Sequence, residues 1–375
     1  MAYENAVVLV PGFFGFGRLG SFYYFADRVA ACLRGAAETA FGRSTPVMGL
    51  ATVPAGSLAE RQAFLLSRLT EADNVLGRPA RYHLVGHSAG GVDSELLRAE
   101  FPISARRWPE LDPNDVRSRL ATITTISAPH YGTYLADSGV VGFLRNPLQH
   151  LTAFPETSAV TFQLLKMAVE RPVIHEALSS VGVRGWSDSA RFLLSLLTDD
   201  KLLGDLRPES MERLRREKAP ALRVPVTCFV TTVPGTPVVV ESKKRKPDEF
   251  FEWIHRLTGQ VVGKPSASAE ADLEELNAFK EPAIRNPKAE MPVFDPTSND
   301  GVVNAMTQIL RTPGARMGGV VLADHGDVIG HYDRQDPLTD GTPINDGVFR
   351  SGAGFGDDQF FELYGRVARA FHATY

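Results

Sequence analysis

The stretch that decides the fold is His83–Gly91, with the sequence HLVGHSAGG. Apolar residues lead into Gly86-x-Ser88-x-Gly90, and a helical pattern, Gly90–Glu100, follows. A turn from strand to helix within so few residues holds the serine in strained backbone geometry, with its Oγ projecting at the sheet edge. Side chains at the two flanking glycines would collide in that turn. The strand before and the helix after favour an activated serine over an ordinary Gly/Ser loop.

Short β-branched runs alternate with helical patterns on both sides of this turn. We expect strands at Ala6–Val10, Val47–Val53, Arg81–Gly86, Leu120–Ser127, Val224–Val233 and Gly318–Ala323, and helices at Phe22–Arg34, Ser57–Leu69 with Ser57 as N-cap, Gly90–Glu100 and Asp357–His372. Strands of four to eight residues separated by such helices predict an α/β protein with a mostly parallel, doubly wound sheet. The carboxyl ends of its strands meet at one edge, where ligands bind.

Two stretches interrupt the strand rhythm, at about 137–220 and 234–296. We expect helices within them at Val160–Glu170, Ser189–Leu197, Pro208–Glu217 and Ala269–Ala278. A bare sheet with its helices needs about 250 residues, so these insertions account for most of the remaining length. We therefore expect residues 1–375 to form one domain with two insertions.

Composition and charge exclude several classes of protein. The 375 residues carry 40 basic and 44 acidic side chains, a net charge of −4, which is unlike a protein that binds nucleic acid. The two cysteines, Cys32 and Cys228, form neither a disulfide framework nor a zinc motif, and the sequence leaves open whether they pair with each other. No run is apolar for long enough to span a membrane, and no secretion signal is recognisable, which predicts a cytoplasmic protein or the mature chain of a secreted one. The basic run Lys243–Lys246 is isolated, so we expect a solvated loop.

An activated serine on this fold needs an acid and then a histidine later in the chain. His325 follows the last predicted strand by two residues, and we favour it over His331 as the base. Asp300, in the turn Ser298-Asn299-Asp300-Gly301, is the predicted acid, with a turn-forming role as the alternative and Asp295 in reserve. Asp346 follows every suitable histidine and has the wrong order.

A tetrahedral intermediate needs two backbone N–H donors. One is expected from Ala89, directly after the serine, and the other from Phe13 in the loop after the first strand. The alternative for Gly12–Gly20 is a phosphate-binding loop, but no nucleotide-binding motif is present.

Together these segments resemble the bacterial triacylglycerol lipases of the α/β-hydrolase superfamily. The resemblance rests on Val7–Gly15, Tyr82–Gly91, Thr124–Thr133, Asn299–Val303 and Asp324–Ile329. It implies an α/β-hydrolase fold, with Ser88 as nucleophile, Asp300 as acid, His325 as base, and Phe13 and Ala89 as oxyanion donors. Pro11 stands where the family has a histidine.

The resemblance also bears on metals. An Asp that matches Asp327 helps to hold a structural calcium in secreted relatives, together with a second Asp. That second Asp is not identifiable in this sequence. We therefore predict no cofactor and leave the metal open.

The family places helices that cover the site in the region of residues 137–220. Its apolar residues, such as Phe143, Leu144 and Leu148, fit either a static cap over an acyl pocket or a mobile lid that contacts a lipid interface. Apolar stripes usually pack as core, so we favour the static cap. The resemblance thus implies a serine carboxylic-ester hydrolase for lipid-like or other apolar esters. An acyltransferase or thioesterase with the same triad, or a non-catalytic lipid-binding module, are the alternatives.

Overall fold

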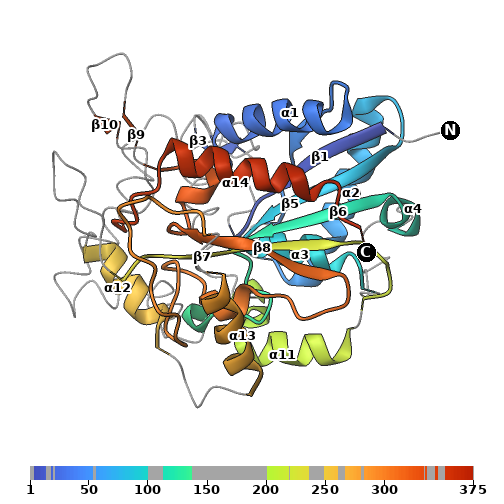
Figure 1. The fold of residues 1–375 in the computed structure, drawn as a ribbon. Helices are drawn as coiled ribbons and strands as arrows, with labels where there is room; N and C mark the ends of the chain where they lie inside the picture. The colour runs from blue at the N-terminus through green and yellow to red at the C-terminus, as the bar shows by residue number, and fades with distance from the viewer. Residues whose placement is uncertain are drawn as a thin grey trace, which may run out of the picture.

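A six-stranded sheet lies at the centre of the molecule (Figure 1). The computed structural model describes residues 4–13, 18–19, 22–53, 56–99, 113–136, 201–218, 220–235, 249–260, 267–279, 283–332, 334–335, 343–344 and 351–374. The sheet comprises β1 (Glu4–Val10), β4 (Val47–Gly49), β5 (Ala80–His87), β6 (Leu120–Ile126), β7 (Val226–Thr232) and β8 (Ala315–Leu322). Its order is β4-β1-β5-β6-β7-β8, and every pairing is parallel, which confirms the predicted α/β class.

Burial on both faces explains why these strands read as continuous apolar runs. In β1, Val7 and Leu9 belong to one hydrophobic cluster, whereas Ala6, Val8 and Val10 belong to a cluster on the opposite face. This alternation follows the two-residue period of a strand, so each strand contributes to two cores.

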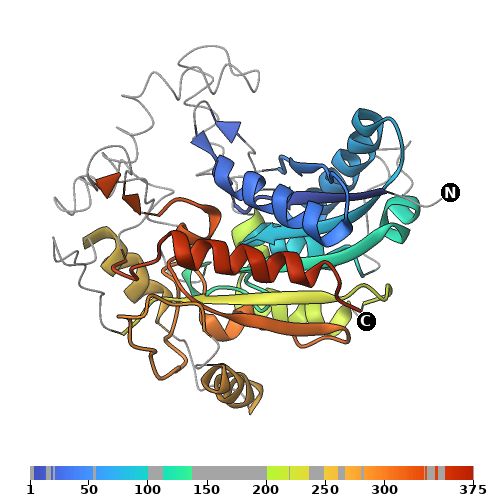
Figure 2. The ribbon, with the colours of Figure 1, turned by 45° about the horizontal axis from the view of Figure 1, so that its top comes forward.

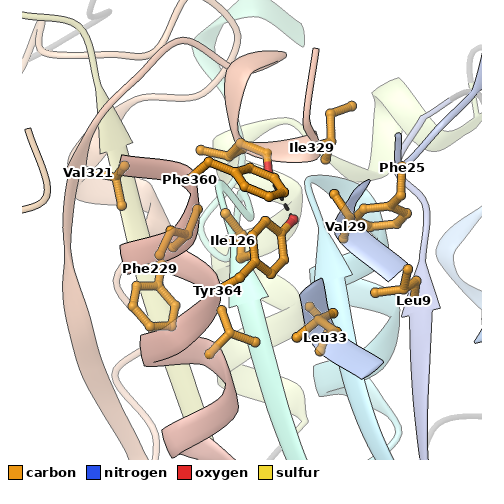
Figure 3. Close-up of a cluster of buried hydrophobic side chains, with 14 of the residues drawn as sticks. Leu9, Phe25, Val29, Leu33, Ile126, Phe229, Val321, Ile329, Phe360 and Tyr364 are labelled. Atoms are coloured by element: carbon orange, nitrogen blue, oxygen red, sulfur yellow. Dashed lines mark hydrogen bonds between the residues drawn. The ribbon is translucent and has the colours of Figure 1, made fainter. Parts of the chain in front are cut away.

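Two helices from opposite ends of the chain, α1 (Asp27–Phe41) and α14 (Asp357–Ala370), cover one face side by side (Figures 1 and 2). Figure 3 shows Leu33, Phe360 and Tyr364 meeting strand residues such as Phe229 in a close-packed cluster. The buried Tyr364 hydroxyl donates to the Val328 carbonyl at 2.8 Å, which satisfies its polar end. Full burial of a large apolar side chain such as Leu33 or Phe360 contributes roughly 1.5–3 kcal/mol to the free energy of unfolding.

The opposite face is covered by α2 (Leu58–Leu76), α3 (Ala89–Leu96) and α4 (Pro113–Ser118), and α10 (Lys201–Asp205) and α11 (Pro208–Glu217) pack against α2 and α3. The predicted N-cap of α2 is confirmed, because Ser57 and Glu60 form a reciprocal capping box. Helix α11 has the predicted bounds.

Some predicted bounds are wrong. The first helix begins at Asp27 instead of Phe22, because Tyr24 and Phe25 are buried and the Ala26 N–H bonds the Ile329 carbonyl at 2.9 Å. The second strand ends at Gly49 instead of Val53. Tertiary contacts thus override local propensity at the start of α1.

The second insertion contains the predicted helix, as α13 (Ala267–Ala278), and one that was not predicted, α12 (Glu249–Thr258). The predicted helices Val160–Glu170 and Ser189–Leu197, with the rest of 137–200, lie outside the described residues.

The remaining described elements are short: the antiparallel pairs β2 (Arg18–Leu19) with β3 (Phe22–Tyr23) and β9 (Arg334–Gln335) with β10 (Pro343–Ile344), and the 3₁₀ turns η1 (Tyr134–Ala136), η2 (Ala305–Gln308) and η3 (Asp327–Ile329). Cys32 and Cys228 are both free thiols. Among the helices of the described residues, none combines the length and apolarity needed to cross a bilayer.

The strand order places a topological switch point at the carboxyl edge of the sheet. From β1 the chain moves outward to β4, whereas from β5 it moves the opposite way to β6. Strands β1 and β5 are neighbours, with Val10 opposite Gly86. The loops that follow these two strands therefore diverge from a topological switch point, where α/β sheets bind ligands.

Candidate active site

Ser88 occupies a strained turn between β5 and α3. Its φ is 54° and its ψ −133°, a conformation that L-residues rarely adopt. The flanking glycines are required by close backbone contacts. A Cβ on Gly86 would lie 2.6 Å from the Gly91 Cα, and one on Gly90 would lie 2.5 Å from the Pro11 carbonyl oxygen. The Ser88 side chain therefore stands at the carboxyl end of β5, with 7% of the residue exposed.

The predicted oxyanion donors lie on the two loops of the switch point. Ala89 is the first residue of α3, a position whose N–H has no acceptor within the helix. Phe13 follows β1, in a loop that touches the serine. A Cβ on Gly12 would lie 2.8 Å from the Ser88 Cβ. Phe13 packs against the hydrophobic cluster that contains Ala89, so both predicted donors belong to segments next to Ser88.

A buried arginine holds this loop. Arg61 of α2 is 0% exposed, and its Nη2 donates to the Gly12 carbonyl at 3.0 Å and to the Asp93 carboxylate at 2.7 Å. The Gly12 carbonyl and the Phe13 N–H belong to one planar peptide unit and point in opposite directions. Arg61 therefore fixes the direction in which the Phe13 N–H points.

Asp300 and His325 form a direct pair. The Asp300 Oδ2 and the His325 Nδ1 are 2.9 Å apart, and the His325 backbone N–H donates to the Asp300 carbonyl at 3.1 Å. Asp300 is fully buried, whereas His325 is 9% exposed. The pair arises because two neighbouring strands bring its members together. The turn with Asp300 lies at the end of β7, where the Val233 N–H donates to the Asn299 carbonyl at 3.2 Å. His325 follows the neighbouring strand β8.

His325 also approaches the turn that carries Ser88. Its ring centroid lies 4.5 Å from that of His87, the residue before the serine. Within the described part of the chain, the Ser88 hydroxyl makes no hydrogen bond to the His325 ring. Such bonds are often long before substrate binds, so this geometry is compatible with proton transfer in a complex.

The rival candidates are held elsewhere. The His331 Nε2 bonds the Tyr24 carbonyl at 3.1 Å, and His372 is exposed on the last turn of the chain. Asp295 is exposed, and its Oδ1 accepts backbone N–H groups of its own turn, such as that of Thr297 at 2.7 Å. Asp346 lies outside the described residues.

Sequence reasoning missed a layer of polar residues behind the site. The Tyr24 hydroxyl bonds the His87 Nδ1 at 2.8 Å, and burial lowers the pKa of His87 well below its usual value. The Thr231 hydroxyl donates to the Asp300 Oδ2 at 2.6 Å. Neither Tyr24 nor Thr231 belongs to a recognisable motif, and only their positions at strand ends could have signalled them.

Asp324 and Asp327, which flank His325, do not fit a calcium site. Asp324 accepts the Gly326 and Asp327 N–H groups and the Ser351 hydroxyl, and Asp327 accepts the Asp324 N–H. Burial raises the pKa of both carboxyls. Among the described residues, no three acidic, histidine or cysteine side chains gather as a metal would need.

Comparison with known proteins establishes the fold. No family model and no curated protein sequence matches the chain. Solved structures do match it. EstA from Clostridium botulinum superposes with a TM-score of 0.54 at 16% identity, over 99% of this chain and 88% of that one. Lipase 1 from Pelosinus fermentans gives a TM-score of 0.53 at 17% identity, over 98% and 99%. The chain therefore has the α/β-hydrolase fold.

Proposed function

We propose that the protein is a serine carboxylic-ester hydrolase in which Ser88, His325 and Asp300 act together. One observation carries the proposal. A serine with φ 54° stands at the tip of β5, and a buried Asp–His pair with a 2.9 Å contact lies beside the same turn. Strain of this kind persists where the surrounding structure imposes it, most often at functional sites.

The proposed reaction proceeds through an acyl-enzyme. The Ser88 Oγ attacks the ester carbonyl as its proton passes to the His325 Nε2, and Asp300 stabilises the resulting imidazolium. The oxyanion accepts N–H bonds from Phe13 and Ala89. The intermediate collapses, and the leaving alcohol takes the proton from His325. Water then attacks the acyl-enzyme in the same way and releases the acid, with Ser88 regenerated.

The substrate that we propose has an apolar acyl group. The supporting observations are the apolar residues of the first insertion, including Phe143, Leu144 and Leu148, and the fold shared with lipase 1 from P. fermentans. A series of p-nitrophenyl esters from acetate to palmitate, with an emulsified triglyceride, measures chain-length preference. Activity on short soluble esters alone would contradict a lipid-like substrate while leaving ester hydrolysis intact.

The nucleophile is tested by Ser88→Ala. We expect this variant to lose at least about 10⁴-fold in kcat, and a fluorophosphonate probe to label the wild-type protein once, at Ser88. Ser118→Ala, on the exposed face of α4, is the matched control and should keep full activity and labelling. Normal ester hydrolysis by Ser88→Ala would overturn the assignment. Product analysis with a competing alcohol distinguishes hydrolysis from acyl transfer.

A further inference from the structure

We propose that Thr231, oriented by Ser127, is a positioning residue that sets how strongly Asp300 supports the charged form of His325. This inference rests on the proposed function. Thr231 lies on β7 and is 0% exposed, and its hydroxyl lies 2.6 Å from the same carboxylate oxygen that receives the His325 Nδ1–H. It reaches the reacting atoms only through Asp300 and His325.

The carboxylate of Asp300 is held by four hydrogen bonds. Its Oδ1 accepts the backbone N–H groups of Val302 at 3.0 Å and Val303 at 2.8 Å. Its Oδ2 accepts from Thr231 and from His325. The two backbone bonds fix the plane of the carboxylate, whereas the Thr231 bond competes with His325 for the electron density of one oxygen.

The direction of the Thr231 hydroxyl follows from its neighbours. A threonine hydroxyl has one hydrogen, and three possible acceptors lie near it: the Asp300 Oδ2 at 2.6 Å, the Ser127 Oγ at 2.7 Å and the Gln308 Oε1 at 3.2 Å. The shorter bond to a charged acceptor is the stronger. The Gln308 Oε1 is already satisfied by the Thr231 backbone N–H at 2.7 Å. The hydrogen therefore points to Asp300.

Ser127 completes the chain of hydroxyls. Its Oγ lies 2.7 Å from the Thr231 Oγ1, and because the Thr231 hydrogen is committed to Asp300, Ser127 is the donor in this contact. Ser127 has a φ of 54°, so among the described residues it shares positive φ outside glycine only with Ser88. By donating to the Thr231 oxygen, Ser127 polarises the Thr231 hydroxyl and strengthens the hydrogen bond that this hydroxyl donates to Asp300, and the strained backbone of Ser127 holds it in place.

The expected consequence is a shift in the pH profile. Without the Thr231 donor, the Oδ2 of Asp300 carries more negative charge and stabilises the imidazolium of His325 more strongly. The acid limb of kcat/KM, where the base becomes protonated, then moves to higher pH. Thr231, Ser127 and Gln308 are all neutral, so the change reaches His325 through hydrogen bonding alone.

Other titratable groups face the pair and are unchanged by these substitutions. His87 approaches from β5, His255 from α12 and Asp324 from the loop after β8. His331 acts electrostatically on His87. These groups contribute equally to the wild-type and variant profiles, so a difference between the profiles reports on Thr231.

The experiment compares Thr231→Val, which has the same shape without the hydroxyl, with Thr231→Ser, which keeps it. Hydrolysis of p-nitrophenyl butyrate is followed from pH 5 to 9 with the full chain. We expect Thr231→Val to lower kcat about 10-fold, to leave KM within about 2-fold, and to raise the acid-limb midpoint by about half a pH unit. Thr231→Ser should restore all three values.

A second variant covers the case in which Thr231→Val does not fold. Ser127→Ala leaves Thr231 in place, and we expect the same direction of shift with a smaller size. An unmoved acid limb in whichever of the two variants folds would overturn this role, even where kcat falls. The wild type and Ser88→Ala are assayed alongside. A wild type without ester hydrolysis, or with hydrolysis that survives Ser88→Ala, would overturn the proposed function and this role with it.

Discussion

The two sides of the candidate site are built by different means. On the nucleophile side, the turn with Ser88 and the loop with Phe13 are shaped by backbone contacts that only glycine allows, and by one buried ion pair, Arg61 with Asp93. On the acid–base side, Asp300 is placed by neutral hydrogen bonds from Thr231 and from backbone N–H groups.

The difference teaches how each side should respond to substitution. A steric or ionic change on the nucleophile side displaces the N–H groups that we propose to bind the oxyanion, so we expect it to lower the rate at every pH. A hydroxyl removed from the acid–base side takes away one of the four hydrogen bonds that hold the Asp300 carboxylate, and it also changes the basicity of the histidine. The first alters kcat alone, whereas the second also moves the pH profile.

The largest effect that tests this comparison is expected from Gly12→Ala. The added methyl would lie 2.8 Å from the Ser88 Cβ and would also meet the Tyr24 hydroxyl, so the loop or the serine must move. A displacement near 1 Å at reacting groups costs on the order of 10²-fold in rate. Steady-state kinetics on p-nitrophenyl butyrate measures this loss, and we expect the acid limb to stay where it is.

The matched control for that variant is Gly35→Ala on the exposed face of α1, where an added Cβ meets nothing within 4 Å. It should keep full activity and gain about 0.5–1 kcal/mol of stability, because alanine favours the helix. Equal activity of Gly12→Ala and wild type would show that the loop has more room than the contacts indicate.

A smaller effect is expected from Arg61→Lys. Lysine keeps the charge but cannot donate at once to Asp93, to the Gly12 carbonyl and to the Val53 carbonyl, as the guanidinium does. The peptide that carries the Phe13 N–H then loses its anchor. We expect kcat to fall about 10-fold with little change in KM, because the lost bond acts on the transition state.

Arg119→Lys is the control for a buried ion pair away from the site. Arg119 pairs with Asp73 at 2.6 Å and donates to the Ala80 carbonyl at 2.7 Å, at the opposite end of the sheet. It should lose stability and keep kcat. Similar kcat values for the two lysine variants would remove the positioning role of Arg61. An acid-limb shift in Arg61→Lys as large as that of Thr231→Val would break the comparison between the two sides.

The same contrast explains what could be predicted from the sequence. The nucleophile turn was visible because its chemistry needs glycines at fixed spacing, at Gly86 and Gly90, and the parallel sheet was visible from strands that are apolar on both faces. The start of α1 was not visible in the sequence, because Tyr24 and Phe25 are buried against the loop that carries Ile329, about 300 residues further along the chain.

The acid–base side was only partly visible. Chain order and turn chemistry singled out Asp300 and His325 as the proposed acid and base, and the structure pairs them. Thr231, Ser127 and Gln308 occupy ordinary strand and loop positions that carry no such signal. Their role comes from side-chain contacts between residues about 70 to 100 positions apart. Helix α12 was missed even though its signal is local, because its buried residues Phe251, Ile254 and Thr258 recur at helical spacing.

The smallest effect on activity is expected at His83, four residues before His87 on β5 and away from both sides. Its Nδ1 bonds the Thr122 hydroxyl at 2.8 Å, and burial, aided by the charge of Arg81, lowers the pKa of His83 to about 3. In the unfolded chain a histidine has a pKa of about 6.5. Between these values the unfolded state binds the proton and the folded state does not, so stability falls as the pH falls.

The predicted consequence is that His83 removes up to about 1.4 kcal/mol of stability for each pH unit below about 6.5. His83→Gln abolishes this contribution, while the buried His87 and His130, whose pKa values burial also lowers, keep theirs. Urea unfolding from pH 4.5 to 7.5 should therefore show a shallower loss of stability in the variant, with kcat at pH 7.5 unchanged. A parallel pH dependence in the two proteins would mean that His83 is protonated in the folded state. A fall in kcat would mean that the packing of His83 on β5 affects the position of the Ser88 turn. The nucleophile side would then extend along the strand beyond the residues in contact with its glycines.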